Sequence, residues 1–168
     1  MRAFTLIELI IVMTIIAILA ISSYAPYDYY GRVSRVRVSR DIISQAVADA
    51  KNLASNGYIF PGTDQNANIG LKIEKDATSI DMIAFQSGST SFVSDTTMKL
   101  IKTVRLEDGV QINTVFPEHA LIYFTAPNGD TRFYGDTNNE LTATGIDIGI
   151  GWKIATTGPL SRNVHIRK

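Results

Sequence analysis

The sequence predicts an α+β fold in which a long N-terminal helix packs on a C-terminal antiparallel β-sheet domain. Three observations predict this fold: an apolar run opens the chain, helical spacing of apolar residues follows, and short alternating runs with turn signals fill the rest. We therefore expect a membrane-spanning helix segment at 4–25, an amphipathic helix segment at 26–57 and a β-rich head domain at 58–168.

The apolar run extends from Phe4 to Tyr24 and contains one charged residue, Glu8. As a helix rising about 1.5 Å per residue, it would be roughly 30 Å long, which matches the hydrocarbon core of a bilayer. Three interpretations compete: a cleaved secretory signal, an ordinary membrane anchor, and a helix that leaves the membrane to pack with copies of itself. They differ in how they account for Glu8.

The first two interpretations account poorly for this acid. A secretory signal could end at Ser23-Tyr24-Ala25, but Pro26 would follow the cut and Glu8 interrupts the apolar stretch. An ordinary anchor gives no reason for an acid four residues after Phe4. A carboxylate in hydrocarbon is costly unless it is protonated or paired. Cleavage between Ala3 and Phe4 would create an amine one helical turn away, and the two charges would stabilise each other.

The segment Ala3–Val12, AFTLIELIIV, resembles the processing signal of type IV prepilins and type II secretion pseudopilins. In that family a membrane peptidase cuts before the Phe and methylates its amine. The resemblance therefore implies a leader of residues 1–3 and processing between Ala3 and Phe4. This chain has Ala3 at the position before the cut, where the family usually has Gly.

The same resemblance implies how subunits assemble. The acid at the fifth mature position, here Glu8, aligns an incoming subunit with the N-terminus of its neighbour, together with Phe4, Thr5 and Leu6. Pro26 stands one position later than the helix-loosening proline that is common in the family, and it implies a helix kink.

The resemblance also implies location and partners. It places the chain in the inner (cytoplasmic) membrane as a single-pass protein with an extracytoplasmic C-terminal domain, which enters an extracellular or periplasmic filament after assembly. The implied partners are the prepilin peptidase, other pilin or pseudopilin subunits, an assembly platform protein and the membrane. The positive-inside rule alone points the other way, because Arg2 precedes the apolar run and four arginines follow it between residues 32 and 40. We follow the resemblance.

Residues 27–56 place apolar side chains three, four or seven positions apart, as on one face of a helix. This stripe consists of Val33, Val36, Ile43, Val47, Ala50 and Ala54. Its small residues would let a sheet approach closely, and Asn56-Gly57 is expected to end the helix. The arginines at 32–40 are expected to face solvent or lipid headgroups, with acidic patches of neighbouring subunits as the alternative.

Short alternating runs predict the strands of the head domain. They lie at 69–73, 80–84, 98–104, 110–115, 121–124, 131–134, 146–154 and 164–166. Pro127-Asn-Gly-Asp130 is the strongest hairpin signal. The short spacing favours an antiparallel sheet. A long helix followed by such a domain resembles the minor pilin or minor pseudopilin branch represented by pseudopilin H. The chain has no cysteine, so it lacks the disulfide that closes a C-terminal loop in many type IV pilins.

Two loops group oxygen ligands at alternate positions, as calcium loops do. The candidate ligands are Asp64, Asn66 and Asn68 in one loop and Asp136, Asn138 and Glu140 in the other. Neither loop fits an EF-hand, because Ile69 and Leu141 occupy the position that requires glycine. We expect polar loops without a cofactor, and calcium is the alternative.

Composition argues against several other functions. Lys and Arg number 16 and Asp and Glu number 16, so nucleic-acid binding is not expected. The only histidines are His119 and His165, and no nucleophile elbow or phosphate loop appears, so we expect no enzyme. Arg162, His165, Arg167 and Lys168 form a small basic tail, which we interpret as a solvated terminus, with DNA contact as the alternative.

These observations predict a structural subunit of a type IV pilus-like filament. A minor pseudopilin of a type II secretion system is the alternative within the same class. A membrane-anchored extracytoplasmic binding protein that does not polymerise is the alternative from another class, and it leaves Glu8 without a role.

Overall fold

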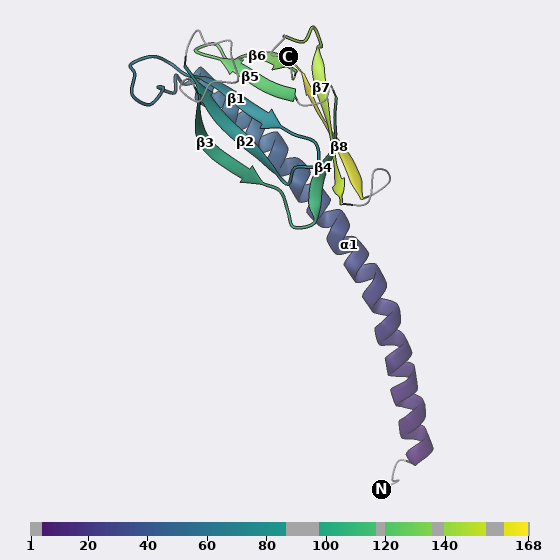
Figure 1. Ribbon diagram of the computed structural model, residues 1–168. Coiled ribbons are helices and arrows are strands. Elements are labelled where there is room, and N and C mark those ends of the chain that lie inside the picture. Colours follow the sequence, from purple (N-terminus) through teal and green to yellow (C-terminus); the bar gives the residue numbers. More distant parts are fainter. Residues whose placement is uncertain (1–4, 87–97, 117–119, 136–139, 154–159, 168) are drawn as a thin grey trace. The chain divides into compact units, whose positions relative to one another are not determined.

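The computed structural model describes residues 5–86, 98–116, 120–135, 140–153 and 160–167. The chain divides into two compact units, Met1–Ser34 and Arg35–Lys168. Helix α1 (Leu6–Ser55) is one element that contributes to both units, so the two expected helix segments are continuous (Figure 1). The backbone of Pro26 lies within α1, and the kink expected there stays a prediction.

In the second unit, α1 buries one narrow face. Its buried side chains recur three or four positions apart: Val36, Ser39, Ile43, Ala46, Ala50 and Ala54. Val47, which we expected on this face, is half-buried. Most of these side chains are small, so the helix backbone can approach the strands closely, and the predicted apolar stripe is confirmed in this unit.

The helix ends as its sequence predicts. The N–H of Tyr58 donates to the carbonyl of Leu53 at 3.1 Å, and the N–H of Gly57 donates to that of Ala54 at 3.3 Å. This pair of bonds defines a Schellman motif, which requires a left-handed residue, and Gly57 has φ of 74°. The carbonyls of Leu53 and Ala54 are thereby satisfied within the chain.

Eight antiparallel strands follow among the described residues, and each overlaps one of the expected runs. They are β1 (Asn68–Ile73), β2 (Ser79–Phe85), β3 (Met98–Arg105), β4 (Val110–Phe116), β5 (Ala120–Thr125), β6 (Asp130–Tyr134), β7 (Gly145–Trp152) and β8 (Ser161–Arg167). The expected hairpin at Pro127–Asp130 joins β5 to β6, with Thr125 opposite Asp130 and Gly129 at φ of 68°.

The strands form two sheets rather than one. Five strands pair in the order β3-β2-β1-β5-β6, and three pair in the order β4-β7-β8 (Figure 1). The backbone of Ile112 in β4 exchanges bonds with Asp76 and Ala77 of the turn between β1 and β2, at 2.7 and 2.9 Å. Strand alternation alone does not predict this division, because it identifies which residues are extended but not which strands pair.

One hydrophobic core joins α1 to both sheets. It contains residues from α1, such as Ile43, and from every strand except β3, which contributes only half-buried Ile101. A second cluster of Phe85, Leu121, Tyr123 and Tyr134 lies on the opposite face of the five-stranded sheet. Alternation along β5 explains the two faces, since Leu121 and Tyr123 belong to the second cluster and Ile122 and Phe124 to the core.

Candidate functional site

The N-terminal start of α1 is a capping box built by Thr5 and Glu8. The N–H of Glu8 donates to Oγ1 of Thr5 at 3.3 Å. In return, Oε2 of Glu8 accepts the N–H of Thr5 at 3.1 Å and its hydroxyl at 3.0 Å. This reciprocal arrangement satisfies donors that a helix start leaves open. The Thr-x-x-Glu spacing before an apolar run is visible in the sequence and is the signal that could have predicted this cap.

The capping box occupies one oxygen of the carboxylate. Among the described residues, Oε1 of Glu8 accepts no hydrogen bond, and both Thr5 and Glu8 are exposed. A carboxylate oxygen held in a fixed rotamer can accept a further charged donor. Ala3 and Phe4, the expected processing residues, lie outside the described residues, so the expected pair between Glu8 and the Phe4 amine stays a prediction.

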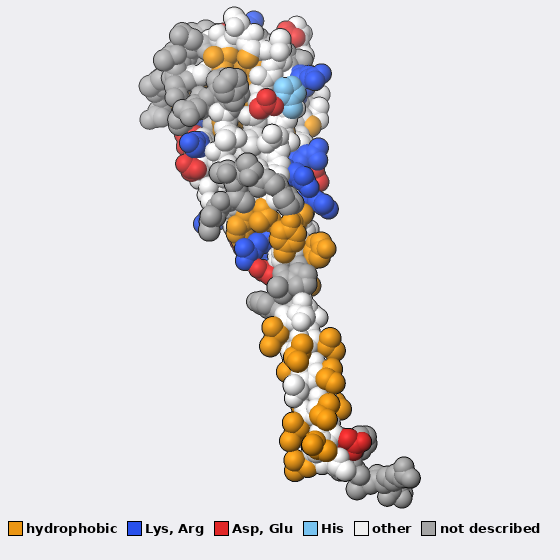
Figure 2. All heavy atoms as spheres, turned by 90° about the vertical axis from the view of Figure 1, so that its right-hand side faces the viewer, with side chains coloured by type: hydrophobic (Ala, Val, Ile, Leu, Met, Phe, Trp, Pro, Cys, Tyr) orange, Lys and Arg blue, Asp and Glu red, His pale blue; other side chains and the backbone are white. Residues whose placement is uncertain are grey.

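The helix beyond Glu8 exposes apolar side chains on all sides. Every described side chain from Leu6 to Ser23 is exposed, and Leu6 itself is 78% exposed. Figure 2 shows these side chains in orange along the N-terminal helix. This is the one described helix that is long and apolar enough to cross a membrane. An exposed apolar surface of this extent requires lipid or other protein around it.

Residues 1–24 match the model of the prokaryotic N-terminal methylation motif. That motif heads a long helix whose second half packs against antiparallel strands. This combination of motif and architecture is that of the type IV pilin and pseudopilin family. Pilins and pseudopilins are non-enzymatic structural subunits, and their motif implies a membrane-anchored precursor that a prepilin peptidase processes and that assembles with other pilin subunits. No curated protein and no solved structure matches this chain.

Polar and aromatic groups follow the apolar part of α1. Tyr27, Tyr29 and Tyr30 are exposed, and the guanidinium of Arg32 contacts the carboxylate of Asp28 at 2.6 Å in an exposed pair. Tyrosines at such a position suit the water interface of a membrane. In the second unit, Arg35 donates to the carbonyl of Asp108 at 3.5 Å, so this arginine also contacts its own head domain.

The first candidate calcium loop has its oxygens in different surroundings. Asp64 and Asn66 are exposed, whereas Asn68 is 8% exposed. Oδ1 of Asn68 accepts the N–H of Ala126 at 2.8 Å, and its side chain is hydrogen-bonded to Tyr123. Asn68 therefore connects β1 to the start of the β5–β6 turn.

The second candidate loop is only partly described. Glu140 pairs with Arg132 at 3.5 Å in an exposed ion pair, and Asp136 and Asn138 lie outside the described residues. Within the described part of the chain, no three acidic or histidine side chains come together as metal ligands. A bound calcium stays an alternative prediction.

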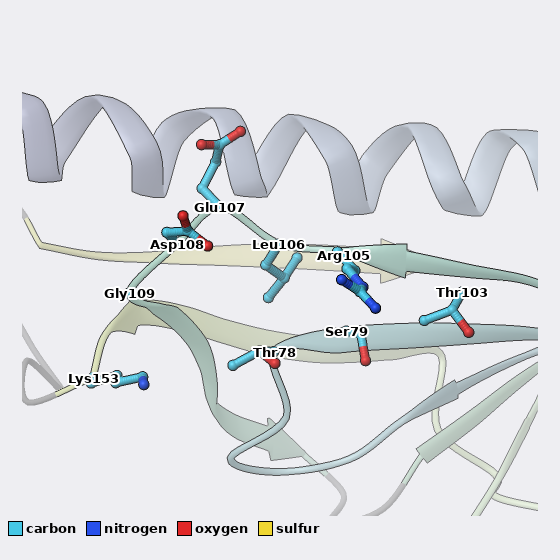
Figure 3. Close-up of a pocket in the computed structure, with 9 residues that line it drawn as sticks. All are labelled: Thr78, Ser79, Thr103, Arg105, Leu106, Glu107, Asp108, Gly109 and Lys153. Atoms are coloured by element: carbon cyan, nitrogen blue, oxygen red, sulfur yellow. The ribbon is translucent and has the colours of Figure 1, made fainter.

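A hollow of about 470 Å³ lies where β3 ends and β4 begins (Figure 3). Its charged side chains are Arg105, Glu107, Asp108 and Lys153, two of each sign. Figure 3 shows Arg105 directed toward Ser79, whereas the carboxylate of Glu107 lies toward the helix.

Of the two histidines in the sequence, the structure describes one. His165 lies in β8 opposite Asp147 of β7, with Nδ1 and Oδ1 2.6 Å apart and both side chains about half exposed. His165 therefore points outward from β8, and the residues that we interpreted as a solvated basic terminus include a paired strand. Arg162 and Arg167 lie in the same strand. His119 lies outside the described residues.

Proposed function

We propose that this chain is a structural subunit of a type IV pilus-like filament, processed after Ala3 and assembled through packing of its N-terminal helix. Glu8 pairs with the Phe4 amine of a neighbouring subunit and sets the register. The observation that carries this proposal is the Oε1 of Glu8, which accepts no hydrogen bond from the part of the chain that the structure describes. Thr5 occupies only Oε2, so the carboxylate keeps one oxygen for an incoming amine.

The exposed apolar part of α1 holds the subunits of the filament together. In the membrane its side chains face lipid, and in a filament they face the helices of other copies. Because both environments are apolar, the transfer changes the hydrophobic energy little, and the charge pair at Glu8 decides the register. The C-terminal head domain remains in the extracytoplasmic space.

Glu8→Gln is the variant that tests this role. Glutamine keeps the length and can accept the Thr5 bonds, but it carries no charge for an amine. We expect membrane levels of the subunit near wild type and a loss of sheared filaments of at least about tenfold, as a lost charge pair in an apolar setting implies. Asp28→Asn is the matched control, because Asp28 is an acid of the same helix whose pair with Arg32 is exposed.

Two outcomes would contradict the proposal. Filaments at wild-type levels in the Glu8→Gln strain would leave the charge without a function. A chain that keeps Met1 in the native host, measured by mass spectrometry, would exclude processing after Ala3. A tethered binding protein that never polymerises predicts that Glu8→Gln keeps its full function.

The second candidate is a minor pseudopilin of a type II secretion system. It is favoured by the strand-rich head that follows the long helix, similar to pseudopilin H in architecture. Deleting the gene for this chain in its native host distinguishes a pilus subunit from a pseudopilin. A pilus subunit predicts loss of surface filaments with normal secretion, and a pseudopilin predicts the reverse.

A further inference from the structure

The hollow between the end of β3 and the start of β4 is lined by two cations that have no partner among the described residues. Arg105 is the last residue of β3, and Lys153 follows β7. Both side chains are exposed, and neither forms an ion pair or a side-chain hydrogen bond within the described part of the chain. The hollow has a volume of about 470 Å³, which is in the range of small-ligand sites.

Two hydroxyl groups complete the set of hydrogen-bond donors around the hollow. Figure 3 shows Thr78 between Lys153 and Arg105, and Ser79 beside Arg105, its partner in the strand register. Neither hydroxyl bonds to another described residue. Thr103 also lines the hollow, but its hydroxyl donates to the carboxylate of Asp81 at 2.7 Å. The available donors are therefore two cations and two hydroxyls.

The two acids that line the hollow oppose these cations only in part. The carboxylate of Glu107 lies toward α1 (Figure 3), and the N–H of this residue donates to Ser39 of the helix. Asp108 is exposed beside the hollow, and its backbone carbonyl accepts a bond from Arg35 at 3.5 Å. The hollow thus faces two cations and one acid, and it favours a ligand with negative charge.

The donors fit phosphoryl groups better than carboxylates. A guanidinium carries five N–H donors and an ammonium carries three. A phosphoryl group presents three acceptor oxygens, whereas a carboxylate presents two. Figure 3 shows Arg105 and Lys153 at opposite ends of the hollow. A ligand that engages both cations therefore carries two phosphoryl groups on a short polar linker.

We propose that this hollow binds a small polyol with two phosphoryl groups. Arg105 binds one phosphoryl group and Lys153 the other, while Thr78 and Ser79 donate to oxygens along the ligand. Two sources have this chemistry: a soluble sugar bisphosphate, and a lipid headgroup with two phosphates, such as that of cardiolipin. This inference goes beyond the filament role and does not depend on Glu8 or on processing after Ala3.

The first experiment titrates fructose bisphosphate with the full-length chain in zwitterionic detergent. Phosphorus NMR follows the broadening of the ligand signals, which reports binding directly. We expect a Kd of about 0.1–1 mM. Inorganic phosphate engages one end of the hollow and should bind at least about tenfold more weakly. Glutarate, a dicarboxylate, should also bind at least about tenfold more weakly.

The second experiment distinguishes the two sources. The full-length chain is placed in nanodiscs with cardiolipin, and fructose bisphosphate is titrated again. If the lipid headgroup occupies the hollow, the apparent Kd of the soluble ligand should rise by at least about tenfold. Phosphatidylglycerol nanodiscs of equal charge are the control, because they repel the soluble ligand without offering two linked phosphates. An equal Kd in both nanodiscs assigns the hollow to the soluble ligand.

Substitutions test the role of each charge. Arg105→Gln and Lys153→Gln should each weaken binding by about tenfold, since each removes a charge-assisted contact. Asp108→Asn removes the nearby acid and should strengthen binding by roughly threefold. Lys102→Gln and Arg167→Gln are the matched controls, because both cations are exposed and neither lines the hollow. The controls should keep the affinity within about twofold.

Several results would overturn the inference. They are the absence of broadening at about 10 mM ligand, equal affinity for inorganic phosphate, and equal weakening by the control substitutions. Equal or tighter binding of glutarate would show that the hollow does not select phosphoryl groups. Circular dichroism shows whether each variant keeps its fold, and the gain expected for Asp108→Asn cannot arise from unfolding.

Discussion

At the scale of single residues, Gly62 and Gly109 have the same backbone requirement in different surroundings. Their φ angles are 87° and 82°, in the region that side chains with a Cβ rarely adopt. A Cβ at Gly62 would meet nothing within 4 Å. A Cβ at Gly109 would overlap the ring of Trp152. Gly62→Ala therefore measures the cost of the backbone conformation alone. Gly109→Ala measures that cost together with the cost of displacing the Trp152 ring.

We expect Gly62→Ala to lower the free energy of unfolding by about 1–2 kcal/mol. Gly109→Ala should lower it by about 1–3 kcal/mol more, because the ring must move. Trp152 is the single tryptophan, so its fluorescence should shift in Gly109→Ala alone. Equal stabilities and identical emission spectra would show that the ring moves aside without cost.

The phenol of Tyr123 belongs to the second cluster and is 4% exposed. Burial raises the pKa of Tyr123 above 10, and the hydrogen bond to Asn68 opposes this shift. The folded state therefore holds this proton more tightly than the unfolded state. The resulting stability is complete below pH 10 and is lost as the pH rises through the raised pKa.

Tyr123→Phe should remove this component of the pH dependence. We expect the variant to be less stable by about 1 kcal/mol at pH 7, because the bond to Asn68 is lost. Its stability should then fall less steeply than that of the wild type above pH 10. Denaturant unfolding at a series of pH values measures both effects, and parallel curves for the two proteins would refute the expectation.

At the scale of elements, the close packing of α1 depends on small side chains. Ala50 is fully buried, whereas Ala48, two positions earlier, is exposed. We expect Ala50→Leu to lower the free energy of unfolding by about 1–3 kcal/mol, since a well-packed core has no room for the added atoms. Ala48→Leu keeps the same composition and should change stability by less than about 0.5 kcal/mol. Thermal unfolding compares the two, and an equal effect would mean that the helix is loosely packed.

At the scale of the whole molecule, stability resides in one unit. All buried residues of the main core lie between Val36 and Ile166. We expect a fragment of residues 35–168 to unfold cooperatively, with a Tm within about 5 °C of the full chain in detergent, because it keeps this core intact. Calorimetry measures both transitions. A fragment that unfolds gradually would show that residues before Arg35 are needed for folding.

The sequence predicted the elements because each depends on local spacing. Residues close in the chain determine the apolar run, the apolar stripe on α1, the end of the helix at Gly57 and the eight described strands. The Thr-x-x-Glu spacing likewise encodes the capping box at Glu8. The methylation motif in residues 1–24 is recognisable for the same reason, since a processing signal is a contiguous segment.

The tertiary structure alone decided which strands pair and what their edges expose. Three features join residues far apart in the chain: the division into two sheets, the burial of Ser39 as acceptor for the N–H of Glu107 at 3.0 Å, and a hollow of about 240 Å³ lined by residues of α1 and β3. Local periodicity shows which face of an element is apolar. It does not show which other element covers that face, because that choice depends on the combined packing of the helix and both sheets.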